Sequence, residues 1–407
     1  MSQTAPLLAS AIRLARRWPP PLGLYGRFML VHYVWQIVIV FLALVGAVTA
    51  INISSEVSSV WQRGAAGGLG QGIAELTEYL FYRLLDNGSQ VFPVAFVLGI
   101  AAAEVTHAMS GRQTMVRTTG MSFERGAKAL FLIAALSVPA QFLLDNAVRP
   151  YAFMSLSVDG LGEYGTGYRE ERKAQTKWLP FGGNIMQIQL QDDPAPRMSA
   201  MTFYEFSRDG DLQRLVDATS AAPLRALGDR LRLTDARVWD FARMPATATG
   251  ETTVQDLAAR FAEHASFDLD LQVSPLWLDY RGIAAKYIPL ADLARLAQSR
   301  GVPDNAPHYG VWLQIRFAQA FAPGLIALCL SGIFFIFLDR FGLRIAAAIM
   351  LAAGYLGFTA IRIMAVVADH GVLPDVVAIW TLPVLFAVTA LFLIRFIRRR
   401  DLAYEPA

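Results

Sequence analysis

Residues 28–51 read FMLVHYVWQIVIVFLALVGAVTAI, a stretch without Lys, Arg, Asp or Glu. An α-helix needs about 20 consecutive apolar residues to cross the hydrocarbon core of a bilayer. This stretch therefore predicts a transmembrane helix. It is too long for the apolar part of a signal peptide and has no small-residue cleavage site beside it, so we expect it to be retained.

Five further apolar stretches meet the same requirement, at residues 89–108, 127–144, 317–338, 345–368 and 376–394. The composition agrees, because 55% of the residues are hydrophobic and 17% are charged, whereas soluble proteins have about 25% charged residues. Mean hydropathy is +0.39. The sequence predicts an α-helical membrane protein with six transmembrane helices. The single cysteine, Cys329, excludes an internal disulfide.

A less apolar segment separates the third predicted helix from the fourth. Residues 151–310 contain 17 Lys and Arg against 21 Asp and Glu, a net charge of −4, while the rest of the chain carries +7. We expect three parts: residues 1–150 with the first three helices, residues 151–310 as a soluble domain, and residues 311–407 with the last three helices. The soluble segment has no dense basic face, so nucleic acid is not an expected partner.

Lys and Arg gather in alternate short loops, and such loops face the cytoplasm. The basic side holds Arg13, Arg16, Arg17, Arg27, Arg112, Arg117, Arg125, Lys128, Arg340, Arg344, Arg395, Arg398, Arg399 and Arg400. The other side has Arg63 and Arg83 between the first two helices, and no Lys or Arg between the last two. We expect both chain termini in the cytoplasm and residues 145–316 outside it.

The soluble domain is predicted to be all β. Met186, Ile188 and Leu190 alternate with three glutamines, which is the period of a strand with one buried face. Similar patterns predict strands at residues 184–191, 200–206, 212–218, 230–241 and 267–273, and one helix at residues 290–300. Several short strands separated by turns are typical of a sandwich or a jelly roll. We expect a jelly-roll-like domain inserted between the third and fourth helices.

Motifs for catalysis and metal binding are missing from the sequence. It contains no Gly-x-x-x-x-Gly-Lys-Ser/Thr phosphate loop, no His-Glu-x-x-His pair and no Gly-x-Ser-x-Gly nucleophile motif. The five histidines are scattered and the cysteine stands alone, so we predict no metal site and no cofactor. We therefore expect a transport or assembly subunit rather than an enzyme, with any ATP hydrolysis in a separate protein.

The loop between the second and third helices, residues 110–122, reads SGRQTMVRTTGMS. Gly120 suits the left-handed end of a short helix. The loop then presents Met115 and Val116 between two arginines. One interpretation is an ordinary positively charged cytoplasmic loop, and the other is a coupling helix that docks into a groove of a separate ATPase. The candidate coupling residues are Arg112, Met115, Val116, Arg117 and Gly120.

Arginines near the opposite membrane surface are candidate lipid-binding residues. A guanidinium can bind a phosphate through two hydrogen bonds, and Arg63, Arg83 and Arg149 are expected at the level of the lipid headgroups. Arg362 lies within a predicted transmembrane helix, where an ionised side chain is costly at the bilayer centre. For each of these residues, the alternative is a side chain that simply extends to the membrane surface.

The order of two helices, the 110–122 loop, a third helix, a β domain and three more helices resembles the LptF/LptG permease family (YjgP/YjgQ). Four local stretches are also similar to the family: residues 61–64 (WQRG), the loop ending in Thr119 and Gly120, the spacing of Tyr309, Arg316 and Gln319, and residues 371–374 (GVLP) followed by Ala378 and Pro383. Together these stretches lean towards LptG over LptF.

The resemblance implies a permease subunit of an ABC transporter that extracts lipopolysaccharide from the bacterial inner membrane for outer-membrane assembly. It implies a heterodimer with a second LptF/LptG-type permease, an LptB-like ATPase dimer, LptC and a periplasmic bridge. The β domain would be periplasmic and pass the lipid to LptC. With Arg316 added, the candidate lipid-binding residues are Arg63, Arg83, Arg149, Arg316 and Arg362.

Two other functions remain possible at this stage. One is the permease of a lipoprotein-release or peptide-export ABC system, although such permeases usually have four helices and a large domain after the first. The other is a membrane scaffold or receptor that binds a periplasmic partner through its β domain. Co-purification with an ATPase would separate the transport functions from the scaffold.

Three positions depart from the family's pattern. Arg112 stands near the start of the coupling segment, where the family usually has a glutamate. Asn52 stands at the outer end of the first helix, where LptG has a lysine, and Ala320 stands where a proline is expected. For Arg112 we expect a compensating acidic group on the ATPase, because like charges at close range repel each other.

Overall fold

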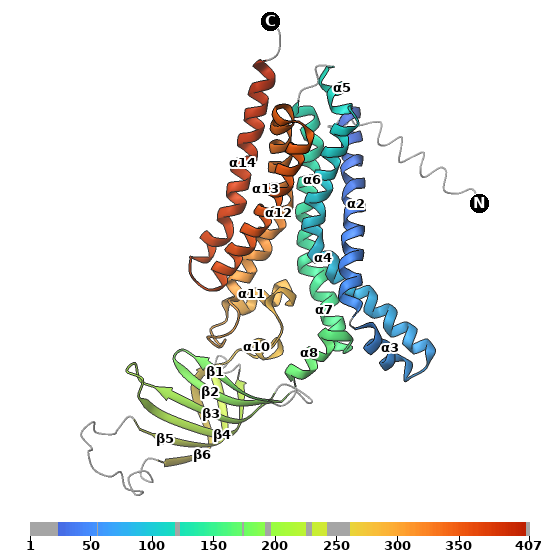
Figure 1. Cartoon of the computed structure of the whole chain (residues 1–407). Coiled ribbons are helices and arrows are strands. Elements are labelled where there is room, and N and C mark those ends of the chain that lie inside the picture. Colours follow the sequence, from blue (N-terminus) through green and yellow to red (C-terminus); the bar gives the residue numbers. More distant parts are fainter. Residues whose placement is uncertain are drawn as a thin grey trace, which may run out of the picture. The chain divides into compact units, whose positions relative to one another are not determined.

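The computed structural model describes residues 23–54, 56–118, 123–172, 175–191, 197–224, 230–241 and 261–403 (Figure 1). The chain divides into two compact units. The bundle unit comprises the described parts of Met1–Ile53, Leu84–Val148 and Gln314–Ala407, and the sheet unit comprises those of Ser54–Arg83 and Arg149–Leu313.

Six helices in the described part of the chain are long and apolar enough to cross a membrane, which confirms the six predicted helices. They are α2 (Gly23–Ser54), α4 (Leu69–Met109), α6 (Phe123–Leu143) with its continuation through the π-helical turn η1 (Leu144–Val148) and α7 (Arg149–Val158), α12 (Tyr309–Phe341), α13 (Leu343–Asp369) and α14 (Asp375–Ala403). α4 begins well before the predicted start at residue 89. It also contains Pro93 without ending there, because neighbouring helices can satisfy the freed backbone groups in a membrane.

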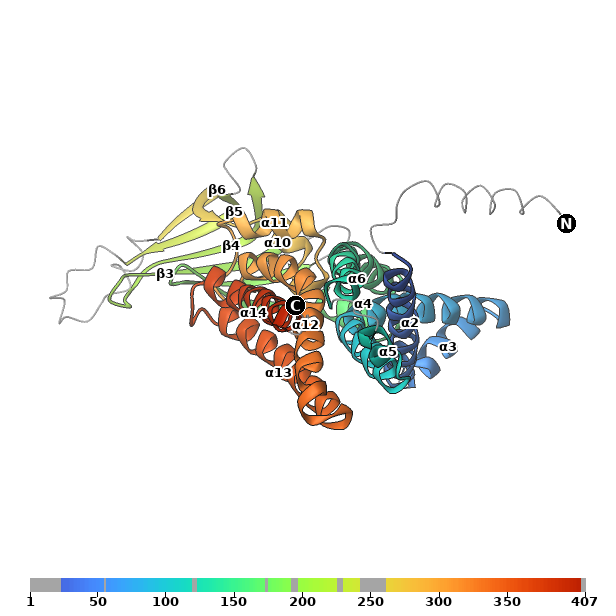
Figure 2. The ribbon, with the colours of Figure 1, turned by 90° about the horizontal axis from the view of Figure 1, so that it is seen from above.

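The helices of the bundle unit pack closely on one another. Seen from above, α2, α4 and α6 form one group and α12, α13 and α14 another (Figure 2). An apolar core that includes residues of α2, α4, α6, α12 and α13 joins the two groups. Small residues allow the close approach: a Cβ on Gly99 would lie 2.5 Å from the Cα of Ile37, and one on Gly324 would lie 2.6 Å from the carbonyl oxygen of Ala134.

Three short helices, α3, α5 and α8, lie in the segments that connect the long helices. α5 (Arg112–Thr118) confirms the short helix predicted in the 110–122 loop. α3 (Val57–Ala65) precedes α4, and α8 (Gly162–Arg172) follows α7. Neither α3 nor α8 was predicted, because both are rich in glycine or polar residues and have no long apolar period.

The β domain is a single antiparallel sheet of six strands in which each strand pairs with the next along the chain. The strands are β1 (Gln175–Phe181), β2 (Asn184–Gln191), β3 (Arg197–Phe206), β4 (Leu212–Leu224), β5 (Arg230–Asp240) and β6 (Phe261–Gln272). The β domain predicted between the third and fourth spans is thereby confirmed, and β1 adds a strand that the alternation did not predict. β1 and β2 are joined by Gly182 and Gly183, both with positive φ, as a tight two-residue hairpin requires.

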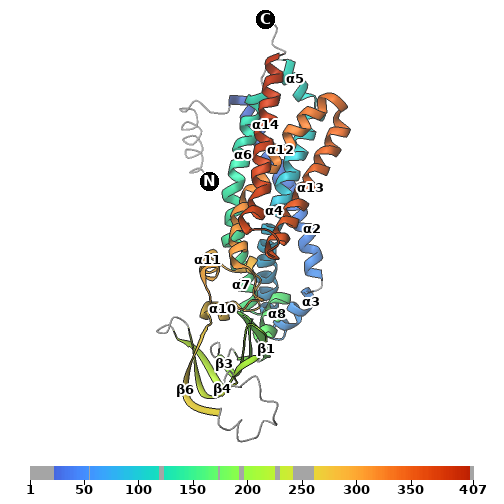
Figure 3. The ribbon, with the colours of Figure 1, turned by 90° about the vertical axis from the view of Figure 1, so that its left-hand side faces the viewer.

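One face of the sheet is covered by the apolar core of the sheet unit. Met186, Ile188 and Leu190 are 0%, 0% and 1% exposed, which confirms the predicted alternation along β2. α10 (Pro275–Asp279), the 3-10 turn η3 (Ala285–Tyr287) and α11 (Leu290–Gln298) contribute side chains to the same core. Figure 3 shows α10 and α11 at one end of the sheet. α11 corresponds to the one helix predicted in this domain.

Candidate functional site

Four of the five candidate coupling residues, Arg112, Met115, Val116 and Arg117, belong to α5, which starts immediately after a glycine turn. Gly111 has a φ of +69°, a conformation that favours glycine, and its carbonyl oxygen accepts a hydrogen bond of 3.1 Å from the backbone N–H of Met115. The side chain of Met115 is 69% exposed, and Val116 is half-buried. α5 thus presents an apolar side chain to its surroundings. Gly120 and the side chain of Arg117 lie outside the described residues.

Arg112, at the start of α5, contacts α2 within the bundle unit. Its guanidinium carbon lies 5.3 Å from the ring centre of Phe28, a distance at which the cation is attracted to the aromatic face. The ring of Phe28 is also nearly parallel to that of His32, at 6.0 Å between centroids. Next to this stack, Tyr25 Oη and His107 Nε2 are 3.0 Å apart. The arginine that departs from the family pattern therefore packs on its own chain.

A carboxylate joins three helices of the bundle unit near this point. Glu104 of α4 accepts a 2.6 Å hydrogen bond from the hydroxyl of Tyr33 in α2. The same oxygen accepts a 3.0 Å hydrogen bond from the hydroxyl of Ser331 in α12. This connection links α2, α4 and α12 through polar atoms inside an apolar bundle.

Arg63, in α3, is held by the sheet unit's own backbone. One terminal nitrogen donates a 2.8 Å hydrogen bond to the carbonyl oxygen of Asp159, and the other donates to that of Gly160. Its Nε lies 3.8 Å from a carboxylate oxygen of Glu75 in α4. The side chain is 42% exposed.

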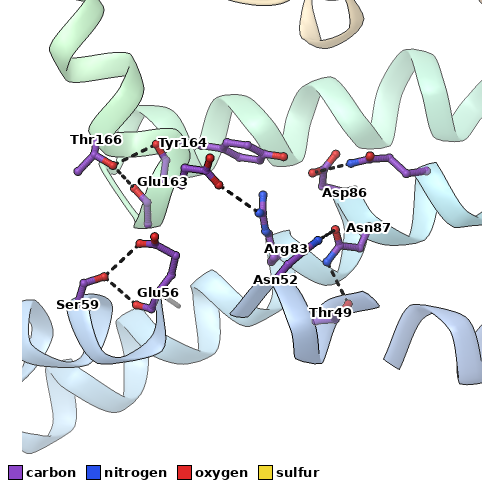
Figure 4. Close-up of polar contacts among 12 residues, drawn as sticks. Thr49, Asn52, Glu56, Ser59, Arg83, Asp86, Asn87, Glu163, Tyr164 and Thr166 are labelled. Carbon is purple, nitrogen blue, oxygen red and sulfur yellow. Dashed lines mark hydrogen bonds and ion pairs between the residues drawn. The ribbon is translucent and has the colours of Figure 1, made fainter. Parts of the chain in front are cut away.

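Arg83, in α4, is buried, with only 6% of its surface exposed. Its Nη2 lies 3.7 Å from a carboxylate oxygen of Glu163 in α8. The guanidinium carbon also lies 4.4 Å from the ring centre of Tyr164. Figure 4 shows the arginine between these two residues of α8. An ion pair and a cation–π contact therefore fix this arginine within the sheet unit.

Arg149 belongs to the same aromatic cluster as Arg83. Its guanidinium carbon lies 5.7 Å from the ring centre of Tyr287. Tyr287 stacks on Phe153 at 4.0 Å, and its hydroxyl lies 2.9 Å from that of Tyr164. The sheet unit thus brings two of the candidate lipid-binding arginines onto adjoining tyrosines.

The two remaining arginines have opposite environments in the bundle unit. Arg316, in α12, is 4% exposed and donates a 3.3 Å hydrogen bond to the side-chain oxygen of Asn146 in η1. Arg362, in α13, is exposed. It lies about 28 Å along α13 from the first residue of that helix, at about 1.5 Å per residue, and so near the end of a span about 30 Å thick.

Asn52, which stands in the position of a family lysine, forms a polar link between α2 and α4. Its amide donates a 3.1 Å hydrogen bond to the side-chain oxygen of Asn87. The amide of Asn87 in turn donates a 3.1 Å hydrogen bond to the hydroxyl of Thr49 (Figure 4). The position supports helix packing in this chain rather than supplying a cation.

A pocket of about 480 Å³ opens at the β1 edge of the sheet unit, where the floor of the pocket is the apolar core. Its lining includes two cationic side chains and several aromatic ones, among them Lys177, Arg281, Trp277, Tyr280 and Tyr309. Tyr280 donates a 2.6 Å hydrogen bond to Asp292. Burial and this hydrogen bond raise the pKa of Tyr280, so its hydroxyl stays neutral at physiological pH.

The model of the family described as lipopolysaccharide export system permease LptF/LptG matches residues 31–396. The chain belongs to this family. It is therefore a permease subunit of an ABC transporter that exports lipopolysaccharide, and a multi-pass protein of the inner membrane. The lipoprotein-release and scaffold alternatives are not favoured. Among curated proteins, no relative matches the chain.

As a subunit of this family the chain is a transporter component and not itself a catalytic enzyme. Among the described residues, no group of three or more His, Cys, Asp or Glu side chains is placed to hold a metal ion. The chemistry available to this LptF/LptG permease is thus the binding and movement of a lipid, by cationic and apolar side chains.

Sequence reasoning found the arginines of this LptF/LptG permease but not what holds them. Tyr164 and Tyr287, which contact Arg83 and Arg149, come from α8 and η3, far from the arginines in the chain. No local pattern signals such a contact. Glu104 is an acidic residue inside the predicted helix at residues 89–108, and this is the sequence signal for its hydrogen bonds to Tyr33 and Ser331.

Proposed function

We propose that this chain forms a heterodimer with a second LptF/LptG-type permease, above an LptB-like ATPase dimer and with LptC as a further partner. Both termini and α5 face the cytoplasm, and the sheet unit is periplasmic. ATP turnover then drives extraction of lipopolysaccharide from the inner membrane and its transfer to LptC and the periplasmic bridge. The family match supports the transport system, and the basic loops support the orientation.

The observation that carries the ATPase partnership is the exposed apolar surface of α5. A seven-residue helix between two spanning helices, with Met115 69% exposed, is suited to an apolar groove on another protein. Arg112, Met115, Val116, Arg117 and Gly120 are the proposed coupling residues.

Replacing Val116 by Asp tests this coupling directly. A charge placed in an apolar contact costs desolvation energy, so we expect a loss of at least about 1 kcal/mol, or about fivefold weaker docking of the ATPase. Lipopolysaccharide-stimulated ATP hydrolysis should fall, while membrane insertion stays intact. Thr114→Asp, at an exposed position of the same helix, is the matched control. Unchanged assembly and turnover in the Val116→Asp complex would remove α5 from the interface.

For the lipid, we propose that Arg63, Arg83, Arg149, Arg316 and Arg362 act at phosphate groups. Arg362 is exposed, and the side chain of Arg63 is 42% exposed, which supports direct contact for these two. Arg83 and Arg316 are buried among their own partners, so their contact with a phosphate would require those contacts to open.

We also propose that the sheet unit receives acyl chains through the pocket at β1. Leu179 and Leu190 belong both to the pocket lining and to the apolar core, and Lys177 and Arg281 supply cations at the same place. Photo-crosslinkers at Ile188, Leu190 and Leu271 should therefore capture lipopolysaccharide during ATP turnover. Crosslinks of equal strength without ATP, or none, would mean that this core stays closed.

A further inference from the structure

The first part of α4, residues 69–83, has a surface that the proposals above do not use. We call it the α4 extension. α4 contains 41 residues, which is about 61 Å at about 1.5 Å per residue, or about twice the hydrocarbon thickness of a bilayer. Residues 84–109 alone are long enough to cross the membrane. The extension therefore lies outside the span and needs its own explanation.

An apolar stripe runs along the outer face of the α4 extension. Leu69, Ile73 and Leu80 are 71%, 51% and 37% exposed. Their spacings of four and seven residues place all three on one side of the helix. Phe81, next to the stripe, is 56% exposed. A helix surrounded by water rarely exposes such a row.

The buried face of the α4 extension, which adjoins the apolar stripe, holds a charge and the closest packing. Arg83 is 6% exposed and Tyr79 is 2% exposed. Gly72 packs against α3, so closely that a Cβ on Gly64 would lie 2.8 Å from the Cα of Gly72. A buried arginine combined with exposed leucines reverses the pattern of a water-soluble helix.

Polar residues lie on the side of the α4 extension away from the apolar stripe. Gln71 and Glu78 are both exposed. Each precedes a stripe residue, Ile73 or Leu80, by two positions, which is about 200° around a helix. The exposed surface therefore has an apolar side and a polar side, as helices that lie in a membrane surface do.

We propose that the α4 extension is an interfacial helix that lies on the bilayer crossed by the rest of α4. Its occupant is lipid rather than protein because the stripe lies on the same continuous helix as the spanning segment. Gly88 and Pro93 give α4 a place to bend, since proline lacks the backbone N–H of a regular helix. The stripe enters the lipid and the side of Gln71 and Glu78 faces water.

This placement gives the extension a role in holding the sheet unit. Arg83 connects the inner face of the extension to α8, through Glu163 at 3.7 Å and the ring of Tyr164 at 4.4 Å. An extension fixed in the membrane surface would keep α8 beside the bilayer. The proposal goes beyond lipid export, because it does not depend on which lipid is transported or on the identity of the ATPase.

Spin labels on the full transporter complex in lipid nanodiscs test the proposal. Cys329→Ser removes the single native thiol, and cysteines are then placed singly at Ile73, Leu80, Gln71 and Glu78. The two pairs are matched, since each is separated by seven residues. Labels at Ile73 and Leu80 should be more accessible to oxygen, and lie about 5–10 Å deeper in the membrane. Labels at Gln71 and Glu78 should be more accessible to a water-soluble nickel complex.

Two results would overturn the proposal. Equal nickel accessibility at all four sites would mean that the extension projects into water. Labels at Ile73 and Leu80 protected from both oxygen and nickel, with photo-crosslinks from these positions to the second permease, would mean that the stripe is a protein interface. Lipopolysaccharide release measured on the same labelled complexes keeps these outcomes separate from a failure of transport.

Discussion

The bundle unit and the sheet unit place their polar and apolar side chains in opposite ways. In the bundle unit Asp86 and Asn87 are 0% and 2% exposed, while Val31 and Leu42 are 68% and 64% exposed. In the sheet unit the interior is apolar, and charged pairs such as Arg232 and Asp268, 2.7 Å apart, lie on the surface. The solvent explains the difference, because lipid favours apolar surfaces and water favours charged ones.

The α4 extension is the exception that this comparison exposes. Its residues belong to the sheet unit by their contacts, yet its exposed leucines and its buried Arg83 follow the pattern of the bundle unit. Polarity, rather than membership of a unit, indicates which solvent a surface meets. The following predictions test whether the two units differ in the way described.

The largest effect is expected from Ile188→Ala in the sheet unit. Ile188 is 0% exposed in an apolar core, and its truncation should cost about 2–5 kcal/mol through lost burial and the cavity left behind. Urea-dependent proteolysis of the sheet unit in the intact chain measures the loss. Gln189→Ala, on the other face of β2, should change stability by less than about 0.5 kcal/mol. Equal effects of the two substitutions would contradict a closed apolar core.

Glu104→Ala is the counterpart in the bundle unit, where a polar contact is removed. Tyr33 and Ser331 would lose their acceptor, and an unsatisfied buried hydroxyl costs about 1–3 kcal/mol. We expect a lower thermal unfolding temperature in detergent. Glu104→Gln keeps an acceptor oxygen and should recover most of the loss. A Gln variant as unstable as the Ala variant would show that the carboxylate charge, rather than its hydrogen bonds, holds α2 and α12.

Much of this organisation could be predicted from the sequence, because it depends on the spacing of apolar and polar residues within short stretches. The six spans follow from the length of their apolar runs, and the strand at Asn184–Gln191 follows from its alternation. β1 was missed because its QTKWLPF sequence places Pro180 in the strand and does not alternate cleanly. The α4 extension was missed because Gly70 and Gly72 suggest a loop, although Ile73 and Leu80 have helical spacing.

The contacts of the arginines could not be predicted, since they depend on partners distant in the chain. Arg63, with a partly exposed side chain, and Arg83, buried beside Tyr164, look alike in sequence, as basic residues expected near the same membrane surface. Their burial is decided by α7 and α8, whose positions no local pattern specifies. The chemistry of each side chain was therefore predictable, but its availability for a lipid was not.

Substitutions at Arg362 test the outer surface of the bundle unit, where this cationic side chain lies among apolar ones. If it binds a lipid phosphate, Arg362→Leu should lose about 1–3 kcal/mol of charge-assisted hydrogen bonding, and lipopolysaccharide release should fall by about tenfold. Arg362→Lys should recover part of the activity, because lysine keeps the charge but lacks the planar fork. Release assays on proteoliposomes separate the cases. Normal release by the Leu variant would mean that Arg362 only extends to the membrane surface.

Substitutions at Arg112 test the end of the bundle unit that carries α5, and their expected effect is the smallest. Its contact with Phe28 in α2 is a cation–π pair 5.3 Å long, worth about 0.5–1 kcal/mol when exposed. If this contact positions α5, then Arg112→Leu and Phe28→Leu should each reduce ATPase coupling by about two- to fivefold. The double variant should be no worse than either single one.

If Arg112 instead pairs with an acidic group on the ATPase, Phe28→Leu should have no effect, and Arg112→Glu should weaken binding most at low salt, where charges are least screened. Arg112→Glu that strengthens binding to the native ATPase would contradict the acidic partner and leave the contact with α2 as the role of this arginine.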